Sequence, residues 1–329
     1  MPQWNKQNKA DAAVCKDELD RVRDTVTIDI GPKAAAPNAA APNAADGAGS
    51  APGGGTILLL GAGRMGGAML RGWLAQGVPA AAISIADPNP APDLVDLAAR
   101  TGVRVNPADG AAVDAASVDT LVVAVKPQMV ESAAAGVLAM LAPHTLVLSI
   151  MAGKTLADLR RLFPAAGSVV RAMPNLPAAV GRGATVAVAE ADCPADRRER
   201  AASLLTAVGS LEWLADEALV DAATALSGSG PAYVFYLVEC LTRAGVEVGL
   251  PADVSERLAR ATVEGAGALM GATGQPAAEL RAGVTSPGGT TAAGLSKLMA
   301  DDHLQSLLNA TLRAAAQRAA ELGGTGPKA

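Results

Sequence analysis

The sequence predicts an α/β protein in which a doubly wound, mostly parallel sheet precedes an all-α C-terminal domain. Short apolar runs alternate with helical segments up to about residue 215, and this order is typical of right-handed βαβ units. From Asp216 onward the pattern indicates helices only. Half of the 329 residues are apolar but only 2% are aromatic. That composition suits helices packed closely on a parallel sheet whose strands are apolar on both faces.

The expected elements follow in this order within a sheet domain at residues 56–215 and a helical domain at 216–329. Each expected strand is a short apolar run that ends at a turn residue, and each helix has a longer apolar period. Strands are expected at 57–60, 83–86, 121–125, 145–150, 169–170 and 184–189. Helices are expected at 64–75 and 94–100, and then at 216–225, 232–245, 252–270 and 290–322.

The segment 232–245 is apolar around most of its circumference. A helix of this kind has to be buried on nearly all sides. A domain of this size has few interior positions for it, so we expect a partner subunit to cover it.

Residues 1–55 differ from the rest of the chain. The first thirty are mostly polar and charged, and 34–55 are almost entirely Ala, Pro, Asn and Gly. Such a segment buries too little apolar surface to offset its ordering entropy. We therefore expect a disordered leader, with a short frayed helix near 12–23. A transit peptide, which its acidic residues disfavour, and a mis-assigned start codon are the alternatives.

A glycine turn follows the first expected strand. Gly61, Gly63 and Gly66 fit the pattern Gly-x-Gly-x-x-Gly, and the turn opens a helix. The three glycines serve a tight turn, a close approach of pyrophosphate and a close contact between helix and strand. In this context the pattern predicts a Rossmann-like dinucleotide-binding domain rather than an ordinary glycine turn.

Asp87 lies at the end of the second expected strand. A carboxylate there accepts hydrogen bonds from a ribose 2′-hydroxyl and repels a 2′-phosphate, so it favours NADH over NADPH. Arg64, inside the glycine turn, would partly offset this preference by attracting phosphate. The alternative is that Asp87 only opens the turn before Pro88.

Two further residues end strands at the edge where ligands sit in open α/β sheets. Lys126 follows the third strand and would reach the cofactor or a substrate carboxylate, or remain a solvated lysine. Asn175 follows a later strand and offers a donor and an acceptor, for a carboxamide or for a turn. From spacing alone the turn is favoured for Asn175.

A second glycine-rich turn occupies Ser286-Pro287-Gly288-Gly289-Thr290-Thr291. Its proline and glycines allow a tight bend that leaves N–H groups unpaired at a helix start. A small carboxylate there would gain hydrogen bonds and a favourable helix dipole. The alternative is an ordinary Ser/Thr N-cap.

The chain resembles pyrroline-5-carboxylate reductases from about residue 56 to about residue 322. The resemblance is carried by five motifs in the family's order: Gly61-Ala62-Gly63-Arg64-Met65-Gly66, Val125-Lys126-Pro127, Arg171-Ala172-Met173-Pro174-Asn175, Leu226-Ser227-Gly228-Ser229-Gly230-Pro231-Ala232-Tyr233 and Ser286 to Thr291. It implies the last step of proline synthesis, in which NADPH or NADH transfers hydride to the C=N bond of 1-pyrroline-5-carboxylate. It also implies an obligate homodimer, with dimers assembled into a larger ring such as a decamer.

The resemblance also implies which residues form the site. The cofactor would be held by Leu60, Gly61, Ala62, Gly63, Arg64, Met65, Gly66, Asp87, Ala124, Val125, Lys126, Pro127, Ile150, Met151, Ala152 and Asn175. The substrate carboxylate would be held by Ser286, Gly288, Gly289 and Thr290. Thr291 would hydrogen-bond the ring nitrogen and orient the imine rather than act as a strong acid. Arg64 and Met151 depart from the family's usual asparagine and alanine, and both departures lie on the cofactor side.

Net charge and residue composition limit which other functions the chain could have. The net charge of −5 argues against nucleic acid or an anionic membrane as the main partner. The three cysteines and two histidines form no metal or disulfide spacing, and no secretory signal or membrane span is present, so we expect a cytoplasmic enzyme without a metal. A 3-hydroxyacid dehydrogenase would carry a lysine after Gly230, where Pro231 to Phe235 contain none. A nucleotide-sensing scaffold would have no reason to keep residues 286–291.

Overall fold

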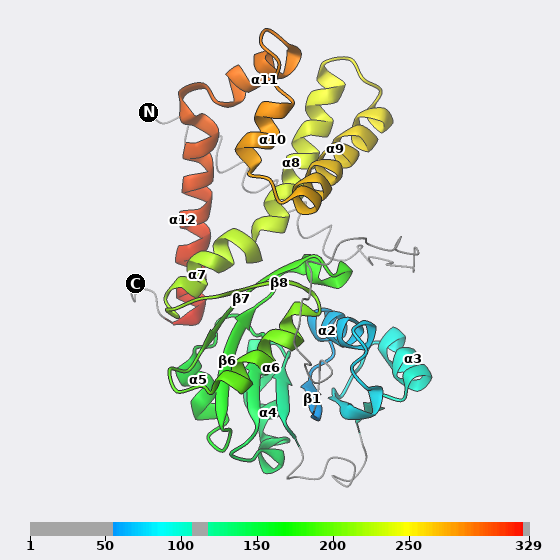
Figure 1. Ribbon diagram of the computed structural model, residues 1–329, viewed down its shortest axis with the longest axis vertical. Helices are drawn as coiled ribbons and strands as arrows, with labels where there is room; N and C mark the ends of the chain where they lie inside the picture. Colours follow the sequence, from blue (N-terminus) through cyan, green and yellow to red (C-terminus); the bar gives the residue numbers. More distant parts are fainter. Residues whose placement is uncertain (1–54, 107–117, 325–329) are drawn as a thin grey trace, which may run out of the picture. The chain divides into compact units, whose positions relative to one another are not determined.

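A computed structural model describes residues 55–106 and 118–324 (Figure 1). All described residues belong to one compact unit, which spans Ala48–Ala329. The leader expected over residues 1–55 lies outside the described residues, except for Gly55. The boundary expected between residues 215 and 216 stays a prediction.

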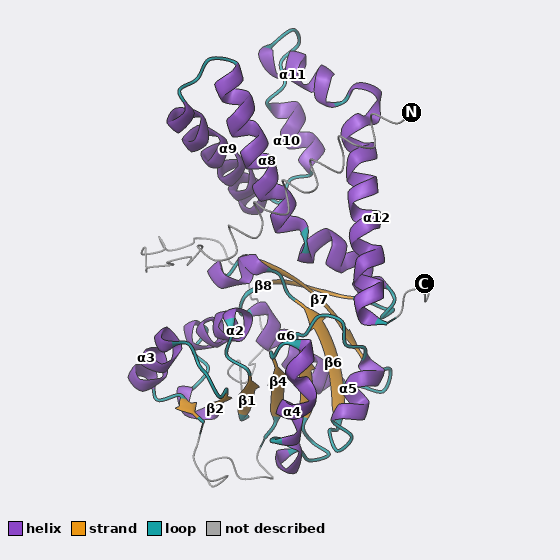
Figure 2. Cartoon of the chain, turned by 180° about the vertical axis from the view of Figure 1, so that it is seen from behind, coloured by secondary structure: helices purple, strands orange, loops and turns teal. Residues whose placement is uncertain are grey.

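Eight strands form one sheet in the order β3-β2-β1-β4-β5-β6-β7-β8. Neighbouring strands run parallel except β6 and β7, which pair antiparallel. The doubly wound, mostly parallel sheet is therefore confirmed; its strands are drawn in orange in Figure 2. The strands are β1 (Ile57–Leu60), β2 (Ile83–Ala86), β3 (Arg104–Val105), β4 (Thr120–Val123), β5 (Leu146–Ser149), β6 (Ser168–Met173), β7 (Gly183–Ala189) and β8 (Gly209–Trp213).

Helices cover both faces of this sheet. They are α2 (Arg64–Ala75), α3 (Pro92–Thr101), α4 (Val130–Ala135), α5 (Leu156–Leu162) and α6 (Ala195–Thr206). Alternate residues of β1 belong to two different cores: Ile57 and Leu59 pack with α2, α3 and α6, whereas Leu58 and Leu60 pack with α4 and α5. Because side chains alternate along a strand, this division explains why β1 is apolar at every position.

Two strands were not expected from the sequence. β3 has only two residues, too few to give a period. β8 is an edge strand in which the exposed Ser210 and Glu212 alternate with half-buried residues, so it lacks the continuous apolar run of the central strands. Its Trp213 ring is covered by the Arg198 guanidinium at 4.4 Å from the ring centroid.

After β8, the regular elements of the described chain are all helices. Its helices are α7 (Leu219–Ala223), a π-helix labelled η6 (Thr224–Gly228), α8 (Gly230–Glu247), α9 (Ala252–Thr273), α10 (Ala277–Gly283), α11 (Thr290–Leu298) and α12 (His303–Gly323). No helix within residues 55–106 and 118–324 is long and apolar enough to cross a membrane.

No residue of α8 is buried in the single chain, although its sequence is largely apolar. Phe235 is 55% exposed and Tyr236 is 60% exposed. The burial expected for this helix is therefore not supplied by its own chain, and the apolar face remains available to a second molecule.

Candidate functional site

The sheet changes direction between β1 and β4. β1 pairs with β2 on one side and with β4 on the other, so the connections leave to opposite sides at this point. In open α/β sheets a crevice forms here, outside the carboxyl ends of the strands, and ligands bind in it. Leu60 is level with Ala86 and Val123, so the residues that follow each of these meet at one edge.

The glycine turn at this edge is closely packed. Gly61 has a φ of +91°, and a Cβ there would lie 2.9 Å from the Val125 nitrogen. A Cβ on Gly66 would lie 2.3 Å from the Gly61 carbonyl oxygen. These two glycines therefore serve the tight turn and the contact between helix and strand, as the sequence pattern predicts.

Gly63 has a different environment. It is the N-cap of α2, and nothing lies within 4 Å of a Cβ built on it. No side chain caps α2, and its first turn contains no acidic residue. The N–H groups of Arg64, Met65 and Gly66 have no acceptor within the helix, because the first intrahelical bond runs from Gly67 N–H to the Gly63 oxygen. This bare helix start fits an anion that approaches over Gly63.

Asp87 lies directly beside this turn. Its Oδ2 accepts a hydrogen bond from the Ala62 N–H at 2.6 Å, and its Oδ1 accepts one from the Asn89 N–H at 2.8 Å. The second bond is the turn that the alternative interpretation expects. The first bond places the carboxylate against the glycine turn, and its contact with a cofactor ribose stays a prediction.

The segments after β4 and β5 complete the same edge. Ala124 and Ile150 continue the ladder, with N–H bonds to Leu60 at 2.8 Å and to Val123 at 3.0 Å. Lys126 is exposed, so its side chain is available to a ligand. Met151 is 3% exposed and packs into the core. The methionine that replaces the family's usual alanine therefore changes the packing of the core beneath this sheet edge, and its side chain does not face solvent.

Three more predicted residues share this edge. Val125 and Pro127 flank Lys126 and are half-buried, whereas Ala152 is exposed. Next to Ala152, a Cβ on Gly153 would lie 3.2 Å from the Leu322 carbonyl oxygen. The last turn of α12 thus packs directly on the loop that follows β5.

Asn175 is committed to bonds within the protein. It is 8% exposed, its Nδ2 donates to the Ser227 carbonyl at 2.9 Å, and its Oδ1 accepts from the Ala184 N–H at 2.9 Å. These bonds join the end of β6 to β7 and to the π-helix η6. They support the turn-building role that spacing favours for Asn175, and its contact with a cofactor stays a prediction.

A charge network around the buried Arg171, which sequence reasoning missed, joins β6 to the segment that precedes α7 and to α7 itself. The Arg171 guanidinium donates to Glu217 at 2.8 Å and lies 3.9 Å from Asp221. The same Glu217 carboxylate accepts the Leu156 N–H at 2.8 Å. The signal was present in the sequence, because Glu217 and Asp221 are four residues apart on one face of a helical turn.

The second glycine-rich turn opens α11. Gly289 is the N-cap of this helix, no side chain caps it, and its first turn contains no acidic residue. The Ser/Thr cap of the alternative interpretation is therefore absent from this described helix. The Gly289 N–H donates to the Ser286 oxygen at 3.1 Å, and Gly288 has a φ of +70°. The first N–H groups of α11, from Thr290 and Thr291 on, have no intrahelical acceptor and can receive a carboxylate.

This turn is exposed in the single chain. Ser286, Gly288, Thr290 and Thr291 are all accessible to solvent. The hydrogen bonds described for the turn are local and do not join it to the glycine turn after β1. One chain therefore has two separate uncapped helix starts, that of α2 at the sheet edge and that of α11.

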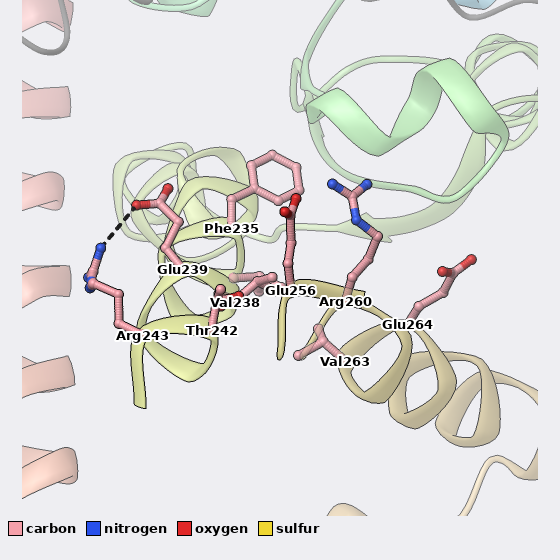
Figure 3. Close-up of a pocket in the computed structure, with 10 residues that line it drawn as sticks. Phe235, Val238, Glu239, Thr242, Arg243, Glu256, Arg260, Val263 and Glu264 are labelled. Carbon is pink, nitrogen blue, oxygen red and sulfur yellow. Dashed lines mark hydrogen bonds and ion pairs between the residues drawn. The ribbon is translucent and has the colours of Figure 1, made fainter. Parts of the chain in front are cut away.

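A groove of about 630 Å³ runs between α8 and α9 (Figure 3). Its apolar lining includes Val234, Phe235 and Val238. Glu239 and Arg243 stand beside them with their charged atoms 3.8 Å apart. The groove is thus part of the uncovered apolar face of α8, and its lining includes neither of the two glycine-rich turns.

Known proteins resemble both parts of the chain. Residues 56–153 match a family model described as NADP oxidoreductase coenzyme F420-dependent, and residues 217–322 match one described as pyrroline-5-carboxylate reductase dimerisation. A pyrroline-5-carboxylate reductase from Pseudomonas aeruginosa is 40% identical over 266 residues, which are 81% of this chain and 96% of that protein. One from Pisum sativum is 35% identical over 81% of this chain and 96% of its own length.

Solved structures agree with these matches. The pyrroline-5-carboxylate reductase of Coxiella burnetii superposes with a TM-score of 0.75 at 32% identity, covering 83% of this chain and 99% of that one. The Plasmodium falciparum enzyme, solved with NADP bound, has a TM-score of 0.66 at 26% identity, with 82% and 98% covered. With its sheet edge, its second glycine-rich turn and these matches over nearly the whole length of its relatives, the chain belongs to the pyrroline-5-carboxylate reductase family.

Proposed function

We propose that this protein reduces 1-pyrroline-5-carboxylate to L-proline with NADPH or NADH, the last step of proline biosynthesis. The observation that carries the proposal is the pair of uncapped helix starts. One lies at the switch point of a doubly wound sheet, and the other opens α11 after Ser286-Pro287-Gly288-Gly289. Each helix start offers main-chain N–H groups to an anion. The reaction needs two such binding sites, one for the pyrophosphate of the cofactor and one for the carboxylate of the substrate.

The cofactor fits the sheet edge. Open space over Gly63 and bare N–H groups at the start of α2 suit the pyrophosphate. Asp87 stands where an adenosine ribose would lie, and Lys126 and Ala152 extend the edge toward the nicotinamide end. When bound, the reduced nicotinamide supplies the hydride.

The chain's own residues bind and orient the substrate. The N–H groups of Thr290 and Thr291 hold the carboxylate, with the helix dipole of α11 adding to the attraction. The Thr291 hydroxyl hydrogen-bonds the ring nitrogen and fixes which face of the imine is presented. A protonated imine is already electrophilic at carbon, so positioning supplies most of the catalysis. This agrees with the absence of histidine from the proposed site residues.

A second chain completes the assembly. Residues 217–322 correspond to the family's dimerisation region, and the exposed apolar face of α8 is the surface that a partner would cover. Expelling water from an active site strengthens the electrostatic interactions inside it, so we propose that dimer formation also covers the exposed turn at 286–291. We propose further that dimers assemble into a ring such as a decamer and that the enzyme is cytoplasmic. A molar mass from light scattering equal to one dimer would refute the ring.

The test is a spectrophotometric assay of NADH and NADPH oxidation with 1-pyrroline-5-carboxylate. We expect Thr291→Ala to lower kcat/KM about 100-fold, as expected when a reacting group is misplaced by about 1 Å. Binding of NADH, followed by its fluorescence, should be unchanged. Thr291→Ser keeps the hydroxyl and should retain most of the activity. Ser296→Ala, which removes an exposed hydroxyl from the same helix, serves as the control and should match the wild type.

The assay also separates the competing functions. No turnover of the imine together with oxidation of a 3-hydroxy acid would indicate a hydroxyacid dehydrogenase. Tight nucleotide binding without turnover of either substrate would indicate a nucleotide-sensing protein. Full activity of Thr291→Ala would remove Thr291 from the mechanism.

A further inference from the structure

The end of β2 is fixed by the side chain of Asn106, the residue that follows β3. Asn106 Oδ1 accepts the Asp87 N–H at 2.8 Å, and Asn106 Nδ2 donates to the Asp87 carbonyl at 2.5 Å. One amide side chain therefore satisfies both polar groups of the Asp87 main chain. The Asn106 N–H also donates to the Ile85 oxygen at 2.8 Å, which ties Asn106 to the same strand.

The backbone of Asn106 is suited to this position. Its φ is +42°, in the left-handed region that asparagine enters more readily than most residues. The conformation turns the chain so that the side chain faces back to β2. An asparagine here is therefore explained by two requirements together, the left-handed backbone and the paired donor and acceptor.

The Asp87 carboxylate is held as firmly as its main chain. Its two oxygens accept the N–H groups of Ala62 and Asn89. With Asn106 fixing the backbone, the carboxylate cannot turn away from the glycine turn without breaking several hydrogen bonds. A ribose 2′-hydroxyl can donate to a carboxylate held there, whereas a 2′-phosphate meets a fixed charge of the same sign.

We propose that Asn106 is a positioning residue that determines cofactor preference, because it holds Asp87 where it favours NADH over NADPH. Asn106 acts through Asp87 and need not touch the cofactor. The inference rests on the proposed function, since it requires that the sheet edge binds a nicotinamide dinucleotide.

The test is a double-mutant cycle of Asn106→Gly and Asp87→Ser. Glycine keeps the left-handed backbone accessible and removes both side-chain bonds, so it isolates the effect of the amide. The measured quantity is the ratio of kcat/KM with NADPH to kcat/KM with NADH, together with the Kd of each dinucleotide from fluorescence titration. We expect Asn106→Gly to raise the ratio about fivefold and Asp87→Ser to raise it at least about tenfold. In the Asp87→Ser background, Asn106→Gly should add less than about 1.5-fold, because the two residues act through one group.

Asn89→Ala is the matched control. The exposed Asn89 side chain makes none of the hydrogen bonds described for this loop, and alanine retains the main-chain N–H. Its ratio should equal that of the wild type. Thermal unfolding of each variant shows whether it is folded at the assay temperature.

Three results would overturn the inference. An unchanged ratio in Asn106→Gly would remove Asn106 from cofactor choice. An equal change with and without Asp87 would show that Asn106 does not act through that carboxylate. A wild-type protein that binds neither dinucleotide would refute the proposed function as well, whereas binding of both with an unchanged Asn106→Gly ratio refutes this inference alone.

Discussion

Replacing single glycines of the turn by alanine separates the two physical roles that the turn combines. An added Cβ at Gly66 would lie 2.3 Å from the Gly61 oxygen, whereas an ordinary contact begins near 3.4 Å. The overlap is thus about 1.1 Å against main chain, which has little freedom to move. Overpacking of this kind costs about 3 kcal/mol. Alanine is a better helix former than glycine by about 1 kcal/mol, so we expect Gly66→Ala to lower the free energy of unfolding by about 2 kcal/mol.

Gly63→Ala should behave in the opposite way. Nothing lies within 4 Å of its added Cβ, and its φ of −69° suits alanine. Alanine is a poorer N-cap than glycine, but it restricts the unfolded chain, so the net change in stability should stay within about 0.5 kcal/mol. The new methyl group occupies the approach to the start of α2, so the Kd of NADH should rise at least about tenfold.

Thermal unfolding and fluorescence titration of the two variants give the comparison. For a chain of this size, with an unfolding entropy of about 2.1 cal/mol/K per residue, a loss of about 2 kcal/mol corresponds to a fall in Tm of about 3 °C. A Gly66→Ala variant as stable as the wild type would refute the packing argument. A Gly63→Ala variant that binds NADH as tightly as the wild type would refute the placement of the pyrophosphate.

Two further predictions concern stability. Arg171→Met should lower the free energy of unfolding, measured in urea, by about 2 kcal/mol, because it leaves the partly buried Glu217 carboxylate without its partner. The smaller change in Glu217→Gln should lower it by about half as much. Equal stability of Arg171→Met and wild type would count against a structural role for this network. Partial burial acts to raise the pKa of Asp158, but hydrogen bonds from the Thr155 N–H and hydroxyl outweigh it and hold the pKa below its ordinary 3.8. Because the pKa is lower in the folded state, the ionised carboxylate stabilises the fold at pH values above the unfolded pKa, and this stability is lost as the pH falls through the folded pKa. Asp158→Asn should therefore be about 0.5–1 kcal/mol less stable than wild type at pH 7. A difference in the free energy of unfolding that persists undiminished below pH 3 would contradict this linkage.

The sequence was sufficient for the features that depend on local pattern. The central strands β1, β4 and β5 are buried at every position, which gives them nearly continuous apolar runs. β1, β2 and α2 begin and end at the predicted residues. β8 was missed because an edge strand with an exposed Glu212 carries no such signal. The bond between Asn106 and Asp87 was missed for another reason: it joins residues 19 apart through a backbone conformation that no periodicity records.

The site residues, too, could be predicted only where the local sequence determines their position. The residue types of the two glycine turns are enough to predict exposed N–H groups, and the position of each turn at a helix start could therefore be predicted. Whether a polar side chain faces a ligand or the protein depends on its tertiary neighbours. Asn175 shows this, because its amide bonds to Ser227 and Ala184 only once β6, β7 and η6 have come together.

The uncovered face of α8 links the stability of this protein to its own abundance. With Phe235 and Tyr236 left in water by a single chain, part of the hydrophobic free energy that holds the helices together is gained only on association. Mass action then makes the unfolding midpoint rise with protein concentration. In a cell, newly made chains would reach their final resistance to unfolding and proteolysis only after meeting another copy.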